Sequence, residues 1–196
     1  MINIEWGLNH SRIEVLQHLV DSKKYKTYLE IGCDKNQVFD KIIVENKEGV
    51  DPNRGGTVRK TSDDFFANDN RTWDLIFIDG LHAYEQVTRD VENAIARLNI
   101  NGTIVIHDML PVRESQATLV PTEKYWLGDV WRLAFDLIER SDIKFNIFTF
   151  DFGCGIITKD SQTPVVVVDK NETWEFYKNN YTKLPLITFN EYFLKS

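Results

Sequence analysis

Short apolar runs alternate with segments of helical period along most of the chain. Residues 75–78 and 103–106 are apolar runs rich in β-branched or aromatic residues, and between them apolar residues recur on one face from Tyr84 to Leu98. This periodicity is typical of an amphipathic helix between two buried strands. Strands joined by a crossover helix run parallel and lie side by side. The pattern therefore predicts a strand–helix–strand unit over residues 73–109, around which the chain is organised.

The same alternation continues on both sides of this unit. It predicts three strands before the unit, at 27–31, 47–51 and 57–60, and two after it, at 143–150 and 155–159. Residues 164–168 could add an edge strand, and residues 189–193 a packing anchor. Helices are predicted at 9–24, where Ser11 and Glu14 form a capping box, and at 37–45, 61–66, 128–139 and 172–180.

Only a tight link, residues 151–155, separates the last two predicted strands, so they must form an antiparallel hairpin. The pattern thus predicts an α/β fold, a Rossmann-like doubly wound sheet of seven strands that is mostly parallel and has an antiparallel terminal hairpin. At 196 residues we expect a single domain. Residues 1–24 would form an N-terminal helical cap, 25–160 the core and 161–196 a C-terminal extension.

Composition and charge narrow the function. The formal net charge is −7, and no block of Lys or Arg is present, so a nucleic-acid partner is not expected. No apolar run approaches the roughly 20 residues that cross a bilayer, so no membrane partner is expected. Cys33 and Cys154 lie far apart in sequence, and a reduced, cytoplasmic setting fits them better than a disulfide does.

Polar residues follow both strands of the central unit. Asp79 comes directly after the first strand, with His82 three residues later, and His107 and Asp108 follow the second strand. The carboxyl ends of parallel strands meet at the sheet edge where open α/β sheets bind ligands. Two carboxylates and two imidazoles at one edge could exchange a proton or hold a divalent ion.

Residues upstream suit a nucleoside. Gly32 follows a strand that ends in Glu30 and Ile31, and a glycine there lets a ligand approach the backbone closely. Asp51 ends the next strand, where a carboxylate can accept from both hydroxyls of a ribose. Asp64 and Phe65 could contact an adenine amino group and ring, or else serve as an ordinary helix cap and core residue. Residues 110–126 contain two prolines without a clear period, which is typical of a lid or substrate loop.

At this point the chain resembles the class I S-adenosylmethionine-dependent methyltransferases over roughly residues 25–160. The motifs that carry the resemblance are Tyr28-Leu29-Glu30-Ile31-Gly32, Asp51, Ser62-Asp63-Asp64-Phe65-Phe66 and Asp74-Leu75-Ile76-Phe77-Ile78-Asp79-Gly80. Three further stretches are similar to a bacterial subgroup associated with glycan or natural-product tailoring, namely residues 79–85, 102–108 and Gly128-Asp129-Val130-Trp131.

The resemblance implies roles for these residues. Glu30 and Gly32 would contact the methionine part of S-adenosylmethionine, Asp51 the ribose hydroxyls, and Asp79 would lie beside the methyl-bearing sulfonium. The chain departs from the family after Gly32, because residues 33–37 replace the usual glycine-rich continuation. The adenine would lie against the run Ser62, Asp63, Asp64 and Phe65.

We therefore expect an S-adenosylmethionine-dependent enzyme that methylates a hydroxyl of a sugar, glycan or small metabolite. Its catalytic residues would be Asp79, His82, His107 and Asp108. A divalent metal ion could be held by Asp79, His107 and Asp108, although Met109 stands where related metal-dependent enzymes carry asparagine. Two alternatives are a metal-assisted hydrolase or hydroxylase at this edge and a degenerate, non-catalytic cofactor-binding subunit. The aromatic tail could pack on the sheet or form a homodimer surface.

Overall fold

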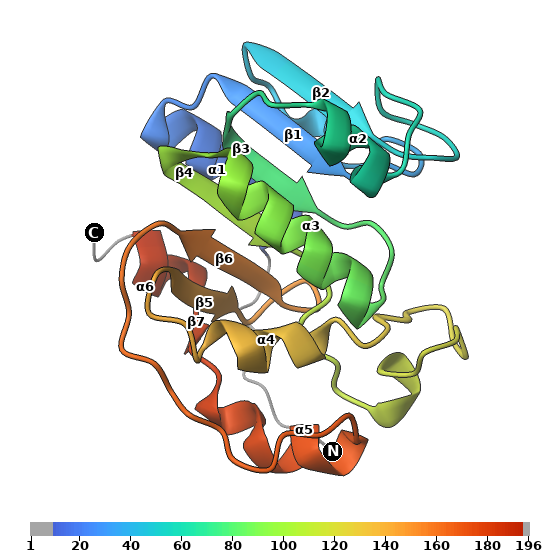
Figure 1. Ribbon diagram of the computed structural model, residues 1–196, viewed down its shortest axis with the longest axis vertical. Coiled ribbons are helices and arrows are strands. Elements are labelled where there is room, and N and C mark those ends of the chain that lie inside the picture. The colour runs from blue at the N-terminus through green and yellow to red at the C-terminus, as the bar shows by residue number, and fades with distance from the viewer. Residues whose placement is uncertain (1–9, 194–196) are drawn as a thin grey trace.

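The computed structural model describes residues 10–193 as a layered α/β fold. The strands of this part of the chain form one sheet in the order β2-β1-β3-β4-β6-β5-β7 (Figure 1). Every strand except β6 points in the same direction, because β6 pairs antiparallel with both β4 and β5. The strands are β1 (Thr27–Ile31), β2 (Asn46–Val50), β3 (Trp73–Ile78), β4 (Leu98–Ile106), β5 (Lys144–Phe148), β6 (Cys154–Thr158) and β7 (Leu186–Ile187).

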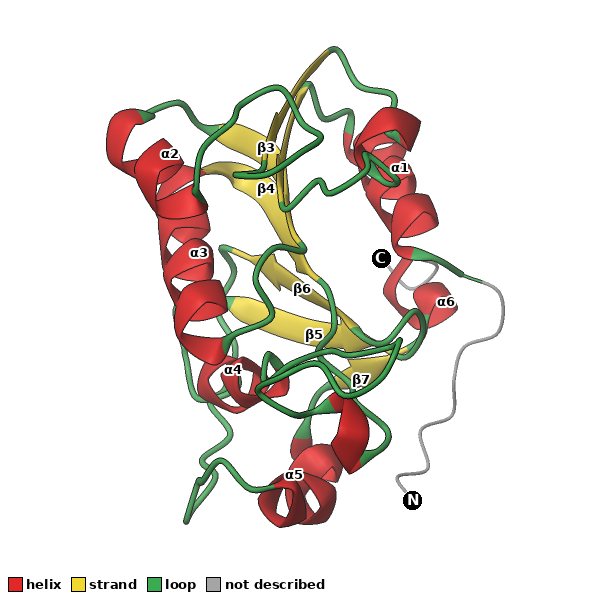
Figure 2. Cartoon of the chain, turned by 90° about the vertical axis from the view of Figure 1, so that its right-hand side faces the viewer, coloured by secondary structure: helices red, strands yellow, loops and turns green. Residues whose placement is uncertain are grey.

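Helices cover both faces of the sheet. In Figure 2, α2, α3 and α4 lie on one side of the strands and α1 and α6 on the other, so the apolar residues form two clusters. None of the helices in residues 10–193 is long and apolar enough to cross a membrane. The helices are α1 (Arg12–Lys23), α2 (Ser62–Asn68), α3 (Tyr84–Arg97), α4 (Trp131–Leu137), α5 (Trp174–Asn180) and α6 (Phe189–Phe193), with short 3-10 turns η1 (Phe39–Lys41), η2 (Glu114–Gln116) and η3 (Tyr181–Lys183).

The central strand–helix–strand unit is confirmed. β3 and β4 pair in parallel, with Ile78 beside Ile106, and α3 packs its buried face on the sheet. The backbone N–H of His107 donates to the carbonyl of Ile78 over 3.0 Å, which continues the pairing one residue past both strands. This register places the residues that follow β3 and β4 next to each other.

Three local predictions are wrong, and one strand was not predicted. Residues 37–45 form only the turn η1, because the β-branched run from Ile42 to Val44 favours extended backbone leading into β2. Residues 57–60 make one bridge to Val50 rather than a strand, since the backbone N–H groups of Thr57 and Val58 both bond Gly49. Residues 164–168 are not a strand, and β7 was not predicted. The sheet therefore keeps seven strands with β7 in place of 57–60, and the 73–109 unit supplies its third and fourth strands in chain order, not the fourth and fifth.

Candidate active site

A cavity of about 890 Å³ runs along the carboxyl ends of β1, β2, β3 and β4. Glu30 within β1 and Gly32 directly after β1 line one part of it, and Asp51 lines it at the end of β2. Asp79 and Asp108 line its other part, after β3 and β4. Part of the predicted nucleoside-binding set thus shares one continuous cavity with the predicted catalytic residues.

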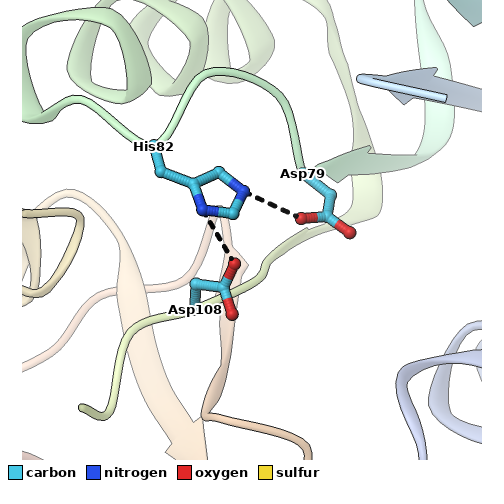
Figure 3. Close-up of side chains that lie close together, drawn as sticks. All are labelled: Asp79, His82 and Asp108. Atoms are coloured by element: carbon cyan, nitrogen blue, oxygen red, sulfur yellow. Dashed lines mark ion pairs between the residues drawn. The ribbon is translucent and has the colours of Figure 1, made fainter. Parts of the chain in front are cut away.

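Asp79, His82 and Asp108 converge in this cavity (Figure 3). Nε2 of His82 lies 3.6 Å from Oδ1 of Asp79, and Nδ1 lies 3.3 Å from Oδ2 of Asp108. The prediction that these side chains meet at one sheet edge is confirmed. Burial opposes protonation of His82, but the charges of Asp79 and Asp108 outweigh it and raise the pKa of the imidazole.

His107 lies beside the same two carboxylates and is more deeply buried than His82. Its Nδ1 lies 3.1 Å from Oδ1 of Asp108 and 3.4 Å from Oδ1 of Asp79, and only 5% of its side chain is exposed. Burial disfavours the imidazolium, but the two carboxylates outweigh burial and raise the pKa of His107 well above its ordinary value. The carboxylates around His107 therefore favour its protonated form, while Nη1 of Arg12 lies 3.1 Å from its Nε2.

Two members of the group were not predicted from the sequence, Arg12 and Asp151. Nη1 of Arg12 donates to Oδ1 of Asp151 over 2.9 Å, and Nε lies 3.7 Å from Oδ2 of Asp79. Asp151 also accepts from the backbone N–H of Arg12 and lies 3.4 Å from Nε2 of His107. Burial raises the pKa of Asp151, but His107 and Arg12 outweigh it and lower the value to about 2. Arg12 and Asp151 are 139 residues apart in sequence, so no local pattern indicates their contact. The only signal was the position of Asp151 in the tight link before β6.

The charges of this side-chain group nearly cancel, and the net charge depends on His82. Three carboxylates, those of Asp79, Asp108 and Asp151, face the cations of Arg12 and His107. Burial would raise the pKa of Asp79, but His107, His82 and Arg12 outweigh burial and lower it. The group is neutral when His82 is protonated and carries one negative charge when His82 is neutral. A neutral His82 thus leaves a site that favours a cationic ligand.

The segment after β4 positions His82. Residues 110–126 are irregular apart from η2, as predicted, and Trp126 stacks on the His82 ring with centroids 5.2 Å apart. The carbonyl of Trp126 lies 3.2 Å from Nδ1 of His82. Gly128 has φ +66°, and a Cβ there would lie 1.8 Å from the carbonyl oxygen of His82. Asp129 accepts from the backbone N–H of Tyr84 over 2.7 Å and so caps α3 just beyond His82.

Gly32 and Glu30 line the cavity where the methionine part of a cofactor is predicted. Gly32 has φ +89°, and a Cβ at this position would lie 2.2 Å from the carbonyl oxygen of Asp79, so glycine is required. Glu30 is buried and accepts from the hydroxyl of Tyr28 over 2.5 Å. Burial raises the pKa of Glu30 to about 7, with the Tyr28 hydrogen bond opposing the shift.

Asp51 joins the two loops beside the cavity. Its Oδ1 accepts from the backbone N–H groups of Asn53 and Arg54 over 2.8 and 2.9 Å, and its Oδ2 accepts from that of Asp34 over 3.0 Å. Burial disfavours the carboxylate, but these N–H groups outweigh it and lower the pKa of Asp51. The ribose contact of Asp51 remains a prediction, and its structural role is to hold the loops together.

The loop that follows Gly32 contains no further glycine over residues 33–37. Asp34 and Asn36 have φ of +44° and +61°, a conformation that Asp and Asn tolerate better than most other residues. The Asn36 side chain accepts from the backbone N–H of Gly56 over 2.6 Å. Aspartate and asparagine thus form the turn that a glycine-rich loop usually forms.

The predicted adenine run is corrected in part. Ser62 lines the cavity, as expected for a ligand contact. Phe65 lies in the core at 3% exposure, Asp63 pairs with Arg89 at the surface, and the exposed Asp64 lies in the first turn of α2 with its N–H on the Thr61 hydroxyl. These three residues therefore do not line the cavity, because α2 directs Asp63 to the surface, Asp64 to the helix cap and Phe65 to the core.

The set of potential metal ligands also differs from the prediction. Asp79, His82 and Asp108 each offer a ligand atom, and these atoms lie within 4.8 Å of one another. His107 was predicted in place of His82. In the described residues, Nδ1 of His107 lies within ion-pair distance of Asp79 and Asp108, and Nε2 lies within ion-pair distance of Asp151. His107 does not belong to the set of converging ligand atoms.

Known proteins match the chain in sequence pattern and in fold. The family model described as a methyltransferase domain matches residues 11–109, half of the chain. No curated protein matches the chain in sequence. Among solved structures, the O-methyltransferase TomG from Streptomyces achromogenes, involved in tomaymycin synthesis and in complex with SAM, is 12% identical with a TM-score of 0.58 over 80% of this chain and 83% of that chain.

Two further solved structures share the fold. The O-methyltransferase from Bacillus cereus, in complex with SAH, is 14% identical with a TM-score of 0.56, over 80% of this chain and 84% of that chain. The methyltransferase MycE from the mycinamycin biosynthetic pathway, in complex with Mg, SAH and mycinamycin VI, is 14% identical with a TM-score of 0.55. That match covers 85% of this chain and 54% of MycE. At these identities the likeness concerns the fold.

Proposed function

Since the chain belongs to the methyltransferase-domain family, we propose that it transfers the methyl group of S-adenosylmethionine to a hydroxyl oxygen of a small molecule or glycan. The observation that carries this proposal is the continuous cavity, which joins Glu30 and Gly32 to Asp79, His82 and Asp108. A nucleoside cofactor and an acceptor can lie in it end to end. Three structural relatives are described as O-methyltransferases or as a natural-product methyltransferase, and all three hold SAM or SAH.

We infer one orientation of the cofactor from the residues that line the cavity. Its methionine part would lie at Gly32, with its ammonium group facing the Glu30 carboxyl, and its ribose would lie toward Asp51. The cationic sulfonium would then lie beside Asp79, where a neutral His82 leaves one uncompensated negative charge. The electrostatics of the site thus suit the charged cofactor better than its neutral thioether product.

His82 is the base in this mechanism. Its Nδ1 faces two acceptors, the Trp126 carbonyl and the Asp108 carboxylate, so Nδ1 carries the hydrogen. Nε2, which lies 3.6 Å from Oδ1 of Asp79, is the nitrogen that accepts a proton. The acceptor hydroxyl gives its proton to Nε2 as its oxygen attacks the methyl carbon. The carbon–sulfur bond breaks, and its electron pair stays on sulfur as S-adenosylhomocysteine.

The other three predicted catalytic residues support this step. Asp108 fixes the His82 ring, and Asp79 stabilises the imidazolium that forms. His107 is buried beside both carboxylates, and its role is to hold them in place. These assignments separate the two histidines, which the sequence alone left equivalent.

A metal-assisted form of the same reaction is the second candidate. Asp79, His82 and Asp108 could hold a divalent ion, and their mixed carboxylate and imidazole donors fit Mn²⁺, Fe²⁺ or Zn²⁺ better than Mg²⁺. A bound ion would polarise the acceptor hydroxyl. Chelator treatment followed by ion addition separates the two forms, because only the metal-assisted form loses activity with chelator and regains it with the ion.

Calorimetry with S-adenosylhomocysteine, followed by measurement of its release from S-adenosylmethionine with a panel of phenolic and sugar hydroxyls, tests the proposal. We expect micromolar binding and turnover of at least one acceptor class. Binding without any turnover would favour the non-catalytic cofactor-binding subunit. No binding at millimolar ligand would reject the proposal and reopen the hydrolase alternative.

A further inference from the structure

A buried carboxyl lines the cavity and takes no part in the proposed chemistry. Asp90 lies on the second turn of α3 and is 1% exposed, yet it faces the cavity. Its neighbours on that helix face, Val87, Val91 and Ala94, are core residues. An apolar residue would serve packing better here, because burying a carboxyl costs free energy unless the carboxyl is compensated.

The protein compensates this carboxyl only in part. Nε2 of Gln86 donates to Oδ1 of Asp90 over 3.0 Å, and the same amide reaches the Ser62 hydroxyl at 3.1 Å. Burial raises the pKa of Asp90, and the hydrogen bonds of Ser62 and Gln86 oppose the shift. Within residues 10–193, no cationic group lies within ion-pair distance of Asp90. A buried acid with so few donors is suited to a donor supplied by a ligand.

The position of Asp90 indicates which ligand group this is. Thr61 and Ser62, at the start of α2, line the cavity together with Gln86 and Asp90. Asp51 lines the neighbouring part, where the ribose is placed in the proposed function. The base of the nucleoside therefore extends toward the corner between α2 and α3.

We propose that Asp90 accepts a hydrogen bond from the exocyclic amino group of adenine and makes the site selective for adenine over hypoxanthine. This inference rests on the proposed function and replaces Asp63 and Asp64 in the role predicted for them. Hypoxanthine carries a carbonyl oxygen in place of the amino group. That oxygen would face the Asp90 carboxylate as one acceptor against another, which a buried site tolerates poorly.

The test compares S-adenosylhomocysteine with S-inosylhomocysteine by calorimetry. The wild-type protein should bind the adenine compound at least about tenfold more tightly, because a hydrogen bond to a charged group is involved. In Asp90→Asn, affinity for S-adenosylhomocysteine should fall about tenfold, while that for S-inosylhomocysteine should stay or rise, since the new amide can donate to the carbonyl. Asp63→Asn is the matched control, because Asp63 accepts from the same Gln86 amide but lies outside the cavity.

Several outcomes would overturn the role of Asp90. These are equal binding of the two compounds by the wild-type protein, unchanged discrimination in Asp90→Asn, or an equal effect of Asp63→Asn. The wild-type comparison needs no variant, so it decides the question even if Asp90→Asn does not fold. Failure of the wild-type protein to bind either compound would overturn the proposed function as well.

Discussion

Glu30 should make the stability of the protein depend on pH in a direction opposite to that of most carboxylates. Burial raises its pKa from 4.5 to about 7 in the folded protein. Between these values the folded state binds more protons than the unfolded state, so stability is highest at low pH and is lost as pH rises through about 7. Each pKa unit corresponds to about 1.36 kcal/mol, so the full effect is about 3 kcal/mol. About 2.5 kcal/mol of it falls between pH 5 and pH 8.

The variant Glu30→Gln removes this titration but keeps an acceptor for the Tyr28 hydroxyl. Urea unfolding of both proteins at several pH values gives the difference in their free energies of unfolding. The variant should gain about 2.5 kcal/mol on the wild type between pH 5 and pH 8. Glu45→Gln is the control, because Glu45 is 62% exposed and pairs with an exposed lysine. Parallel pH profiles of the wild type and Glu30→Gln, within about 0.5 kcal/mol, would refute the reasoning.

Three further variants test the group around His82. His82→Gln should lower kcat about 100-fold or more with little change in affinity for S-adenosylhomocysteine, and an equal loss of both in steady-state kinetics and calorimetry would argue against a base. Arg12→Ala should lower the free energy of unfolding by about 3 kcal/mol or more, since it leaves buried carboxylates uncompensated; a loss below about 1 kcal/mol in urea would show that the ion pairs are screened. Gly128→Ala should lower stability by about 1–3 kcal/mol and lower kcat, because the new Cβ meets the His82 carbonyl, and normal turnover would show that this contact does not position His82.

Much of the fold could be predicted from periodicity. The unit over 73–109 has a long amphipathic helix between two apolar strands, so local pattern and tertiary packing agree. Local pattern failed where tertiary contacts decide the backbone. The two-residue β7 has no periodicity to detect, and residues 57–60 lose their strand because their N–H groups bond Gly49.

The residues of the site could also be predicted from the sequence only in part. Asp79, His82, His107 and Asp108 were predictable because strand ends in a parallel sheet must meet at one edge. Arg12 and Asp151 were not, since their contact joins opposite ends of the sequence. Asp90 lies on a face of α3 whose other buried residues are apolar. Its burial is therefore recognised from the fold and not from the sequence pattern. The cytoplasmic setting and the homodimer stay predictions.

A crystal structure of the protein with S-adenosylhomocysteine tests the central claim most directly. The account predicts the ligand in the cavity, with its amino-acid part at Glu30 and Gly32, its ribose toward Asp51, and its sulfur facing Asp79 and His82. Ligand bound elsewhere, or a sulfur turned away from His82, would contradict the proposed mechanism.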